Sequence, residues 1–407
     1  MSVQEVEPAG ASPTPVHQQA AHLRWRQRLA QRDVGSLPVV IGLFVIWGIF
    51  QSQNDRFLSA GNLTNLMLQI AALGTVATGI VLVLLLGEID LSVGWVSGLS
   101  AAVMAVLNVK HGWPAVPAIA AGLGTGAVIG TVQGLWITRL KVPSFVVTLA
   151  GLLAWQGALL YVLGKTGTVN LTDTQITGLA GTFFSTGVSW VIAGLGLGIY
   201  AAAALLAWRR RAAARLPQAR AGMEVLKLVG VASATIAAVV VFTRDRGLPL
   251  NVLIFLGLVV IFSLFARRTA FGRHIYAVGG SAEAAHRAGI HVDRVRIAVF
   301  AICSTMAAAG GILGASRLLA VNQSSGGSDF LLNAIAAAVI GGTSLFGGRG
   351  APHSALLGAL VIGSIGNGMD LLAFGSDVKF MITGAVLVIA ATIDAVGRRG
   401  RQTAGKA

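Results

Sequence analysis

The chain has 407 residues, of which 55% are hydrophobic and only 11% are charged, and its formal net charge is +15. Soluble proteins carry roughly 25% charged residues, so this composition excludes an ordinary soluble domain and predicts a surface that mostly faces lipid. The basic residues lie between hydrophobic runs rather than in one patch, which argues against nucleic acid as a partner. The single cysteine, Cys303, excludes an internal disulfide framework. Its apolar neighbours predict a packing role.

The first 36 residues are polar, contain Pro13 and Pro15, and end in a cluster of arginines. A secretory signal would place a short apolar region much nearer the start. We therefore expect a disordered cytoplasmic tail at 1–36, one transmembrane domain at 37–397 and a second cytoplasmic tail at 398–407.

Charged residues divide the remaining sequence into apolar intervals. A spanning helix needs ~20 mostly apolar residues, and a charge in hydrocarbon costs several kcal/mol. The intervals without Asp, Glu, Lys or Arg predict an all-α polytopic membrane protein with about 12 transmembrane helices. These intervals are 34–54, 57–87, 91–109, 111–138, 142–164, 174–208, 228–243, 247–266, 297–316, 330–348, 350–369 and 380–393.

The distribution of Lys and Arg predicts the orientation. If the N-terminus lies inside and each interval crosses once, most of the 30 basic residues fall on the inner side. Cytoplasmic loops carry such an excess of positive charge. Both termini are therefore expected in the cytoplasm.

One apolar interval carries a stripe of glycines, Gly122, Gly126, Gly130 and Gly134, at one residue per helical turn. Small residues allow close approach of membrane helices, which gain little from the hydrophobic effect in lipid. The stripe predicts a tight contact with another helix.

Two short segments, 87–94 and 341–348, share the frame Gly-x3-Leu-x2-Gly, and apolar runs flank each of them. The first contains Glu88 and Asp90, the only acids between residues 56 and 172. Asp90 either caps a helix that begins at Leu91 or lies beside a polar path, and the first role does not exclude the second. The candidate residues for a path or gate are Gly87, Glu88, Asp90, Ser92, Gly94, Thr343 and Ser344.

The segment 267–296 is the longest polar interval between hydrophobic runs. Ser281 precedes Glu283-Ala284-Ala285 and can cap a short helix, with Gly289 just past its end. The segment is either a plain cytoplasmic linker or a small knob that docks into a partner's groove. The docking candidates are Glu283, Ala284, Ala285, Arg287 and Gly289.

No arrangement of residues in the sequence is typical of catalysis or metal binding. His274, His286 and His291 lie in the polar segment at spacings that zinc ligands do not use. We predict no catalytic residue, no metal ligand and no cofactor bound by this chain.

The Glu-Ala-Ala-x3-Gly pattern at 283–289 resembles the coupling loop of ABC importer permeases. Four blocks in order resemble the ribose/xylose branch of that family: 87–94, 141–149, 271–295 and 340–348. Residues 188–245 contain two further apolar runs and an arginine-rich loop. Ribose permeases lack such an insert, whereas D-xylose permeases are similar in carrying it. The proline usual downstream of the final glycine in importers is missing here, as it is in this branch.

The resemblance implies a permease subunit of an ATP-driven importer in the bacterial inner membrane. Ten core spans and a two-helix insert at 188–245 would carry a monosaccharide, with D-xylose favoured over ribose. The cytoplasmic coupling loop at 266–296 would dock on separate ATPase subunits. A periplasmic or extracellular sugar-binding protein, a second permease copy and membrane lipid are the other implied partners. A stand-alone secondary transporter is the rival, and a membrane-embedded enzyme is disfavoured because no catalytic site is evident.

Overall fold

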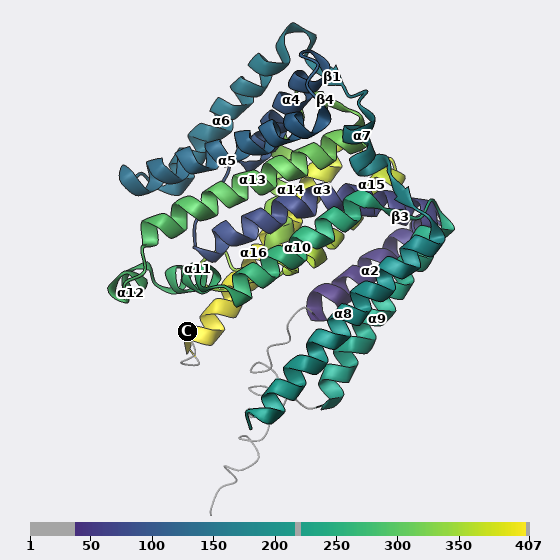
Figure 1. Ribbon diagram of the computed structural model, residues 1–407, viewed down its shortest axis with the longest axis vertical. Helices are drawn as coiled ribbons and strands as arrows, with labels where there is room; N and C mark the ends of the chain where they lie inside the picture. The colour runs from purple at the N-terminus through teal and green to yellow at the C-terminus, as the bar shows by residue number, and fades with distance from the viewer. Residues whose placement is uncertain (1–36, 216–220, 404–407) are drawn as a thin grey trace, which may run out of the picture.

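The computed structural model describes residues 37–215 and 221–403. The predicted tail at 1–36 lies outside the described residues. The chain folds as one helical bundle with four very short strands (Figure 1). The long helices are α2 (Leu37–Gln53), α3 (Ala60–Leu85), α4 (Val93–Val109), α5 (Ala115–Arg139), α6 (Ser144–Leu163), α8 (Thr186–Ala213), α9 (Ala221–Arg244), α10 (Leu250–Arg268), α13 (Val292–Leu318), α14 (Ser328–Ile340), α15 (Ser354–Leu371) and α16 (Ser376–Thr403).

Within the described residues, 8 helices are long and apolar enough to cross a membrane. The helices α2, α4 and α14 are apolar but shorter, and α16 completes the set. The all-α polytopic fold predicted from the sequence is confirmed. The last helix, α16, continues to Thr403 and so runs past the boundary predicted at residue 397.

The two ends of the bundle differ in their short elements (Figure 1). One end carries α11 (Ala270–Gly280), α12 (Ala282–Arg287) and the last turns of α16. The other end carries α7 (Thr174–Gly181), the 3-10 turn η1 (Gly164–Thr166) and two antiparallel strand pairs. These pairs join β1 (Thr168–Asn170) to β4 (Ala320–Asn322) and β2 (Phe183–Phe184) to β3 (Leu248–Pro249). The first end is cytoplasmic, because it holds the basic segment 267–296.

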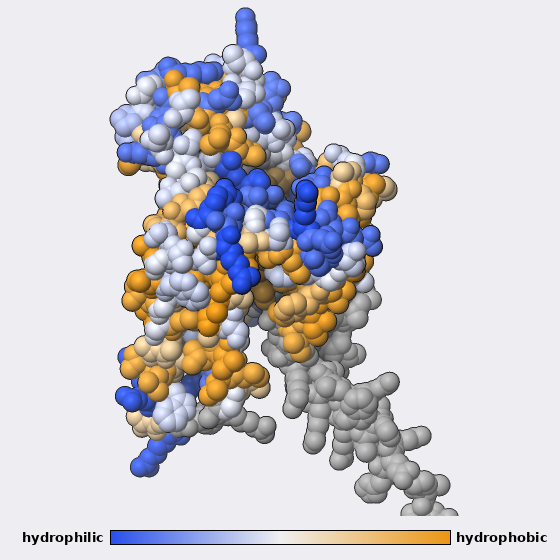
Figure 2. All heavy atoms as spheres, turned by 90° about the vertical axis from the view of Figure 1, so that its right-hand side faces the viewer, coloured by the Kyte–Doolittle hydropathy of each residue, from blue (hydrophilic) through white to orange (hydrophobic). Residues whose placement is uncertain are grey.

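The outer end is polar at its surface. Figure 2 faces the side where β3 and α7 lie, and hydrophilic side chains gather across the middle of that view, between apolar surfaces of the helices. This pattern is expected where a bundle leaves the hydrocarbon and meets water.

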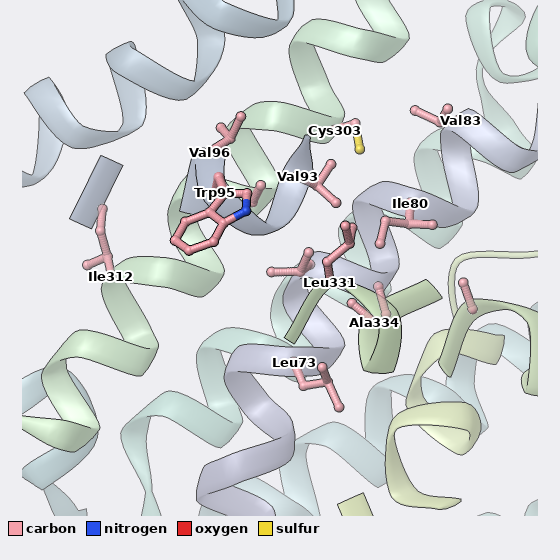
Figure 3. Packing of buried hydrophobic residues seen from close by; sticks show 14 of the residues in the cluster. Leu73, Ile80, Val83, Val93, Trp95, Val96, Cys303, Ile312, Leu331 and Ala334 are labelled. Carbon is pink, nitrogen blue, oxygen red and sulfur yellow. The ribbon is translucent and has the colours of Figure 1, made fainter. Parts of the chain in front are cut away.

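The helix α3 is the centre of the bundle. Of its most apolar 18-residue window, 94% is buried inside the protein. Figure 3 shows its side chains Leu73, Ile80 and Val83 among residues of α4, α13 and α14. Cys303 of α13 is fully buried nearby, which confirms its predicted packing role.

The predicted glycine stripe on α5 packs along α13. A Cβ atom built on Gly126 would lie 2.4 Å from the backbone oxygen of Ser304, and one on Gly130 would lie 2.3 Å from that of Phe300. Such distances leave no room for a side chain. The predicted close helix contact is confirmed.

The interval 174–208 is not one span. Asp173 caps α7 by accepting hydrogen bonds from the backbone of Gln175 and Ile176. The chain is then extended at β2, and the spanning helix α8 begins only at Thr186. The interval thus contains a short helix and a strand ahead of its spanning helix, which the absence of charge does not reveal.

The interval 330–348 also forms less helix than predicted. Here α14 ends at Ile340, and Gly342 follows with a φ of +102°. Gly347 and Gly348 also have positive φ. The glycines favour this irregular backbone because L-residues with side chains rarely adopt it.

Candidate functional site

The cytoplasmic knob is the short helix α12. Ser281 precedes it and its Oγ accepts a hydrogen bond from the backbone of Ala284 at 3.2 Å. The turn after the helix is closed by bonds from Gly289 N to His286 O at 2.9 Å and from Ile290 N to Ala285 O at 3.0 Å. Gly289 has a φ of +82°. The short helix, its serine cap and its terminal glycine are as the sequence predicted.

Four of the five docking candidates face water. Glu283 and Arg287 form an ion pair across one turn, and their side chains are 75% and 77% exposed. Ala284 and Gly289 are exposed, and a Cβ atom on Gly289 would meet nothing within 4 Å. Ala285 instead is buried and joins the hydrophobic core. Ala285 therefore anchors the knob, and the other four residues form its open surface.

The knob is tied to the bundle through α11. Thr269 caps this helix by accepting from Gly272 N at 3.0 Å, and Ile275 and Val278 are buried against the core. The Tyr276 hydroxyl donates to Gly350 O at 2.9 Å. Burial raises the pKa of Tyr276 and outweighs the opposite effect of Arg267, so this hydroxyl keeps its proton at neutral pH.

Three backbone segments meet where α11 ends. A Cβ atom on Gly279 would lie 1.7 Å from Leu85 O and 2.8 Å from Gly348 N. Gly348 N also donates to Leu85 O at 2.9 Å. The last residue of α3, the loop after α14 and the end of α11 are thus in direct backbone contact. We call this contact of Leu85, Gly279 and Gly348 the glycine junction.

The two repeated segments lie against each other at this junction. A Cβ atom on Gly87 would lie 3.5 Å from Phe346 O, and one on Gly347 would lie 2.9 Å from Gly87 N. Thr343 and Ser344 are buried close by, and Thr343 Oγ1 lies 3.4 Å from Ser354 Oγ. The start of the first segment, at Gly87, therefore touches the end of the second, at Phe346 and Gly347, on the cytoplasmic side.

Glu88 links three elements at the same end of the bundle. Its carboxylate pairs with Arg296 of α13 at 3.0 Å and accepts from Ser144 Oγ of α6 at 2.6 Å. The Glu88 and Arg296 side chains are only 15% and 27% exposed. We call this arrangement the Glu88 latch, since it joins the loop after α3 to the helix that follows the knob.

Asp90 lies deeper in the bundle and is buried. Its Oδ1 accepts from Ser92 N at 2.9 Å and from Ser92 Oγ at 2.7 Å. Gln133 of α5 donates to Ser92 Oγ at 2.9 Å. The helix α4 begins at Val93 rather than at the predicted Leu91, so Asp90 organises the turn before the helix.

Gly94 does not belong to the cytoplasmic cluster. It lies in the first turn of α4, and a Cβ atom there would be 2.6 Å from Gly326 O. The seven path candidates therefore divide into a cytoplasmic cluster and a deeper set of Asp90, Ser92 and Gly94.

The sequence interpretation did not single out Arg296, Ser144 or Gly279. Ser144 lies in the block 141–149 and Arg296 ends the polar segment 267–296. A glutamate between two apolar runs, such as Glu88, needs a cationic partner when it is shielded from water. That need is the feature of the sequence that points to an arginine such as Arg296. Gly279 carried no signal, because its contacts come from residues far away in sequence.

Within the described residues, no group of three His, Cys, Asp or Glu side chains could hold a metal ion. The outer end carries a shallow pocket of about 360 Å³, whose lining includes Asn108, Trp113 and Asp173. The Asn108 amide donates to Asp173 at 3.1 Å. That hydrogen bond is the main reason why the pKa of Asp173 is lowered.

A helical bundle of this kind, with apolar spans and polar loops gathered at its two ends, defines a polytopic membrane protein. The chain belongs to the family described as "Branched-chain amino acid transport system / permease component", whose model matches residues 62–391. It is an inner-membrane, multi-pass permease.

Three relatives illustrate the similarity. The xylose transport system permease protein XylH of Escherichia coli K12 is 37% identical over 366 residues, which cover 89% of this chain and 90% of the relative. The protein of the same name from Haemophilus influenzae is 34% identical over 370 residues, which cover 89% of this chain and 96% of the relative. The ribose import permease protein RbsC of Bacillus subtilis is 33% identical over 355 residues, which cover 87% of this chain and 91% of the relative. No solved structure matches the chain.

Proposed function

We propose that the chain is the permease subunit of an ATP-driven importer that carries D-xylose into the bacterial cytoplasm. The observation that carries the choice of sugar is the 37% identity to the E. coli xylose permease protein over 89% of this chain. Ribose is the second candidate, because ribose import permease proteins match at 30% to 33% identity. The insert formed by α8 and α9 favours xylose, by the resemblance in sequence described above.

The proposal assigns ATP hydrolysis to separate cytoplasmic subunits and gives this chain no enzymatic role of its own. The knob supports this division, because Glu283, Ala284, Arg287 and Gly289 are exposed at the cytoplasmic end. A small helix with an alanine face suits a groove on a partner, since it excludes water with little loss of side-chain entropy.

Motion of the knob has a direct route into the bundle. The helix α11 precedes the knob and reaches the end of α3 through the glycine junction. The helix α13 follows the knob and carries Arg296 of the Glu88 latch. Because packed helices move as rigid bodies, a shift of α12 would displace both contacts together. This arrangement supports a cytoplasmic gate made by Gly87, Glu88, Thr343 and Ser344.

The remaining partners follow from the same proposal. A sugar-binding protein on the outer side would deliver xylose, and a second copy of the permease would complete the path. Neutral sugar needs hydrogen-bonding groups rather than fixed charge along its route. Ser92 and Gln133 beside Asp90 carry groups of that kind, but they are buried and bonded to each other, so they hold the turn before α4 rather than face the route.

The test of the sugar is uptake into proteoliposomes that hold the chain with its ATPase and binding protein. We expect saturable uptake of labelled D-xylose that needs ATP and is competed by xylose better than by ribose. A preference for ribose would overturn the choice of sugar. Robust uptake by the permease alone would overturn the ATP-driven mechanism in favour of a secondary transporter.

The test of the knob is Gly289→Asp, with Gly112→Asp as the matched control. Both glycines have positive φ, +82° and +69°, and neither has an atom within 4 Å of a built Cβ. Gly112 lies at the outer end, away from the proposed ATPase contact. We expect Gly289→Asp to reduce ATPase binding at least about tenfold, a loss of ~1.4 kcal/mol, and Gly112→Asp to leave it unchanged. Intact complex formation and uptake in Gly289→Asp would refute the docking role.

A further inference from the structure

The segment 322–329 runs from the last residue of β4 to the first turn of α14, has the sequence Asn-Gln-Ser-Ser-Gly-Gly-Ser-Asp and contains no apolar side chain. The charge pattern of the sequence places it in an external loop between two spans. The structure instead folds it against the inner half of α4. A Cβ atom on Gly98 would lie 2.0 Å from Ser325 O, and one on Gly94 would lie 2.6 Å from Gly326 O.

The contacts of α4 fix how deep this segment lies. A Cβ atom on Gly311 of α13 would be 2.1 Å from Ser97 O, so Gly311 and Ser97 share one level with Ser325 and Gly326, the part of the segment that contacts α4. Gly311 lies seven residues before the outer end of α13 at Leu318. At 1.5 Å per residue this is about 10 Å below the helix end. The helix α14 has only 13 residues, since it begins beside this segment at Ser328 and already ends at Ile340.

The segment starts at the outer end, where Asn322 pairs with Thr168 of β1 and Gln323 lies against Gly167, and descends to Ser325 and Gly326 beside α4. Asn322, Gln323, Ser324, Ser328 and Asp329 all have exposed side chains in the single chain. Its turn is held in shape by Asn322, whose Oδ1 accepts from Ser324 N at 3.0 Å and from Ser324 Oγ at 2.9 Å. The exposed groups therefore keep a defined position.

Lipid cannot solvate such a segment. Irregular backbone at membrane depth occurs only where protein buries it or where it lines a water-filled cavity. The exposed Asp329 carboxylate and the exposed hydroxyls of Ser324 and Ser328 would be costly in hydrocarbon. Transporters also place substrate sites at helices interrupted in mid-membrane.

We infer that segment 322–329 lines the water-filled path and contacts the transported solute through Gln323, Ser324 and Ser328. The chemistry of these groups suits a neutral polyhydroxylated molecule, because amides and hydroxyls exchange hydrogen bonds with water and sugar alike. The identity of that solute as xylose rests on the proposed function. The glycines of α4 give the segment the room to lie inside the bundle.

The first test measures water access with single cysteines in the full chain, assembled with its partners and carrying Cys303→Ser. Ser324→Cys places a thiol on the segment. Ala120→Cys is the control, because Ala120 is exposed on α5 two residues from Gly122, whose built Cβ lies 2.9 Å from Ser100 O at a similar depth. The probe is a charged, membrane-impermeant methanethiosulfonate applied to both faces.

We expect Ser324→Cys to react at least about tenfold faster than Ala120→Cys, because thiolate forms readily only in contact with water. Xylose at saturating concentration should slow the first reaction and leave the second unchanged. Equal rates for the two variants would overturn the inference. Fast reaction without protection by any pentose would overturn the solute contact.

The second test perturbs the surface of α4 against which the segment packs. Gly98→Ala would push on Ser325 O, whereas Gly124→Ala on α5 would meet nothing within 4 Å. We expect uptake to fall at least about tenfold in Gly98→Ala and to stay unchanged in Gly124→Ala at equal protein levels. Normal uptake in Gly98→Ala would count against the inference.

The two proposals can fail separately. If xylose uptake is absent but Ser324→Cys still reacts faster than Ala120→Cys, the water-lined segment stands and the proposed sugar falls. If ATP-driven xylose uptake is robust but the two cysteines react equally, the proposed function stands and the segment is not part of the path.

Discussion

The helices α3 and α8 are almost equally hydrophobic, yet they occupy opposite environments. Within their most apolar windows 94% of α3 is buried, whereas none of α8 is. Both contain glycines, but a Cβ atom on Gly79 of α3 would lie 2.8 Å from Met306 Cβ, and one on Gly196 of α8 would meet open space. Hydropathy therefore identifies a membrane helix without saying whether protein or lipid surrounds it.

The molecule divides into a core, which includes α3, α4 and α13, and a peripheral hairpin formed by α8 and α9. The glycine junction, the Glu88 latch and segment 322–329 all contact α3, α4 or α13. The hairpin of α8 and α9 joins the core near its outer end, where β2 pairs with β3 and Phe242 packs on Leu248 and Val252. Figure 1 shows the two helices side by side along one flank of the bundle.

The largest effect is expected at the glycine junction. Gly279→Ala would place a Cβ atom 1.7 Å from Leu85 O, whereas Gly280→Ala would meet nothing within 4 Å. Backbone atoms cannot move aside cheaply, so we expect ATP-driven uptake to fall more than about thirtyfold in Gly279→Ala and less than about twofold in Gly280→Ala. Similar uptake by the two variants, at equal amounts in the membrane, would show that the junction does not transmit motion.

The contrast between α3 and α8 can be tested on stability directly. Gly79→Leu would collide with Met306 and the backbone of Cys303, and Gly196→Leu would extend into lipid. We expect Gly79→Leu to lower the free energy of unfolding by about 3 kcal/mol or more and Gly196→Leu by less than about 0.5 kcal/mol. Denaturation in detergent micelles, followed by loss of helical signal, measures both values.

A smaller effect is expected at the Glu88 latch. Arg296→Ala leaves the Glu88 carboxylate, 15% exposed, with Ser144 as its remaining partner among the contacts described above. We expect a loss of about 1–3 kcal/mol, less than for a fully buried pair because both side chains keep some contact with water. Arg296→Lys should recover part of the loss, and the charge reversal Glu88→Arg with Arg296→Glu should recover more than either single reversal. Equal stability of all these variants would remove the latch from the account.

The smallest effect is expected from pH at His353, in the loop after α14. Partial burial, and then the nearby Arg267, lower the pKa of His353 below its ordinary value of 6.5. The unfolded chain therefore binds the proton first, so stability is highest above pH 6.5 and falls as the pH drops below it. Because solvent screens the interaction between His353 and Arg267, the loss of stability should stay under about 1 kcal/mol. Thermal unfolding at pH 7.5 and 5.5 should show the loss in the parent chain and not in His353→Gln.

The sequence predicts the bundle well because charge is costly in hydrocarbon and so marks where helices end. The interval 174–208 is longer than the spanning helix it contains, because α7 and the strand at Phe183 carry no charge that would mark the break before α8. The charge pattern places segment 322–329 in an external loop. No residue near it in the sequence indicates that it packs against Gly94 and Gly98 of α4.

The candidate site was predictable where its shape is local. Ser281, Glu283 and Gly289 define a short capped helix by their spacing alone, and the helix is present. The inward position of Ala285 and the pairing of Glu88 with Arg296 depend on residues distant in sequence. Such contacts are set by packing, which a single sequence does not display.

The most direct test of the division into core and hairpin removes the hairpin. Phe184 pairs with Leu248, so a two-residue turn in place of residues 186–246 can close the chain as a β-hairpin. With the ATPase and binding protein present, we predict ATP-dependent D-xylose uptake within about fivefold of the parent chain, since mainly peripheral contacts are lost. A shortened chain that inserts and binds the ATPase but shows no ATP-dependent uptake would contradict the account.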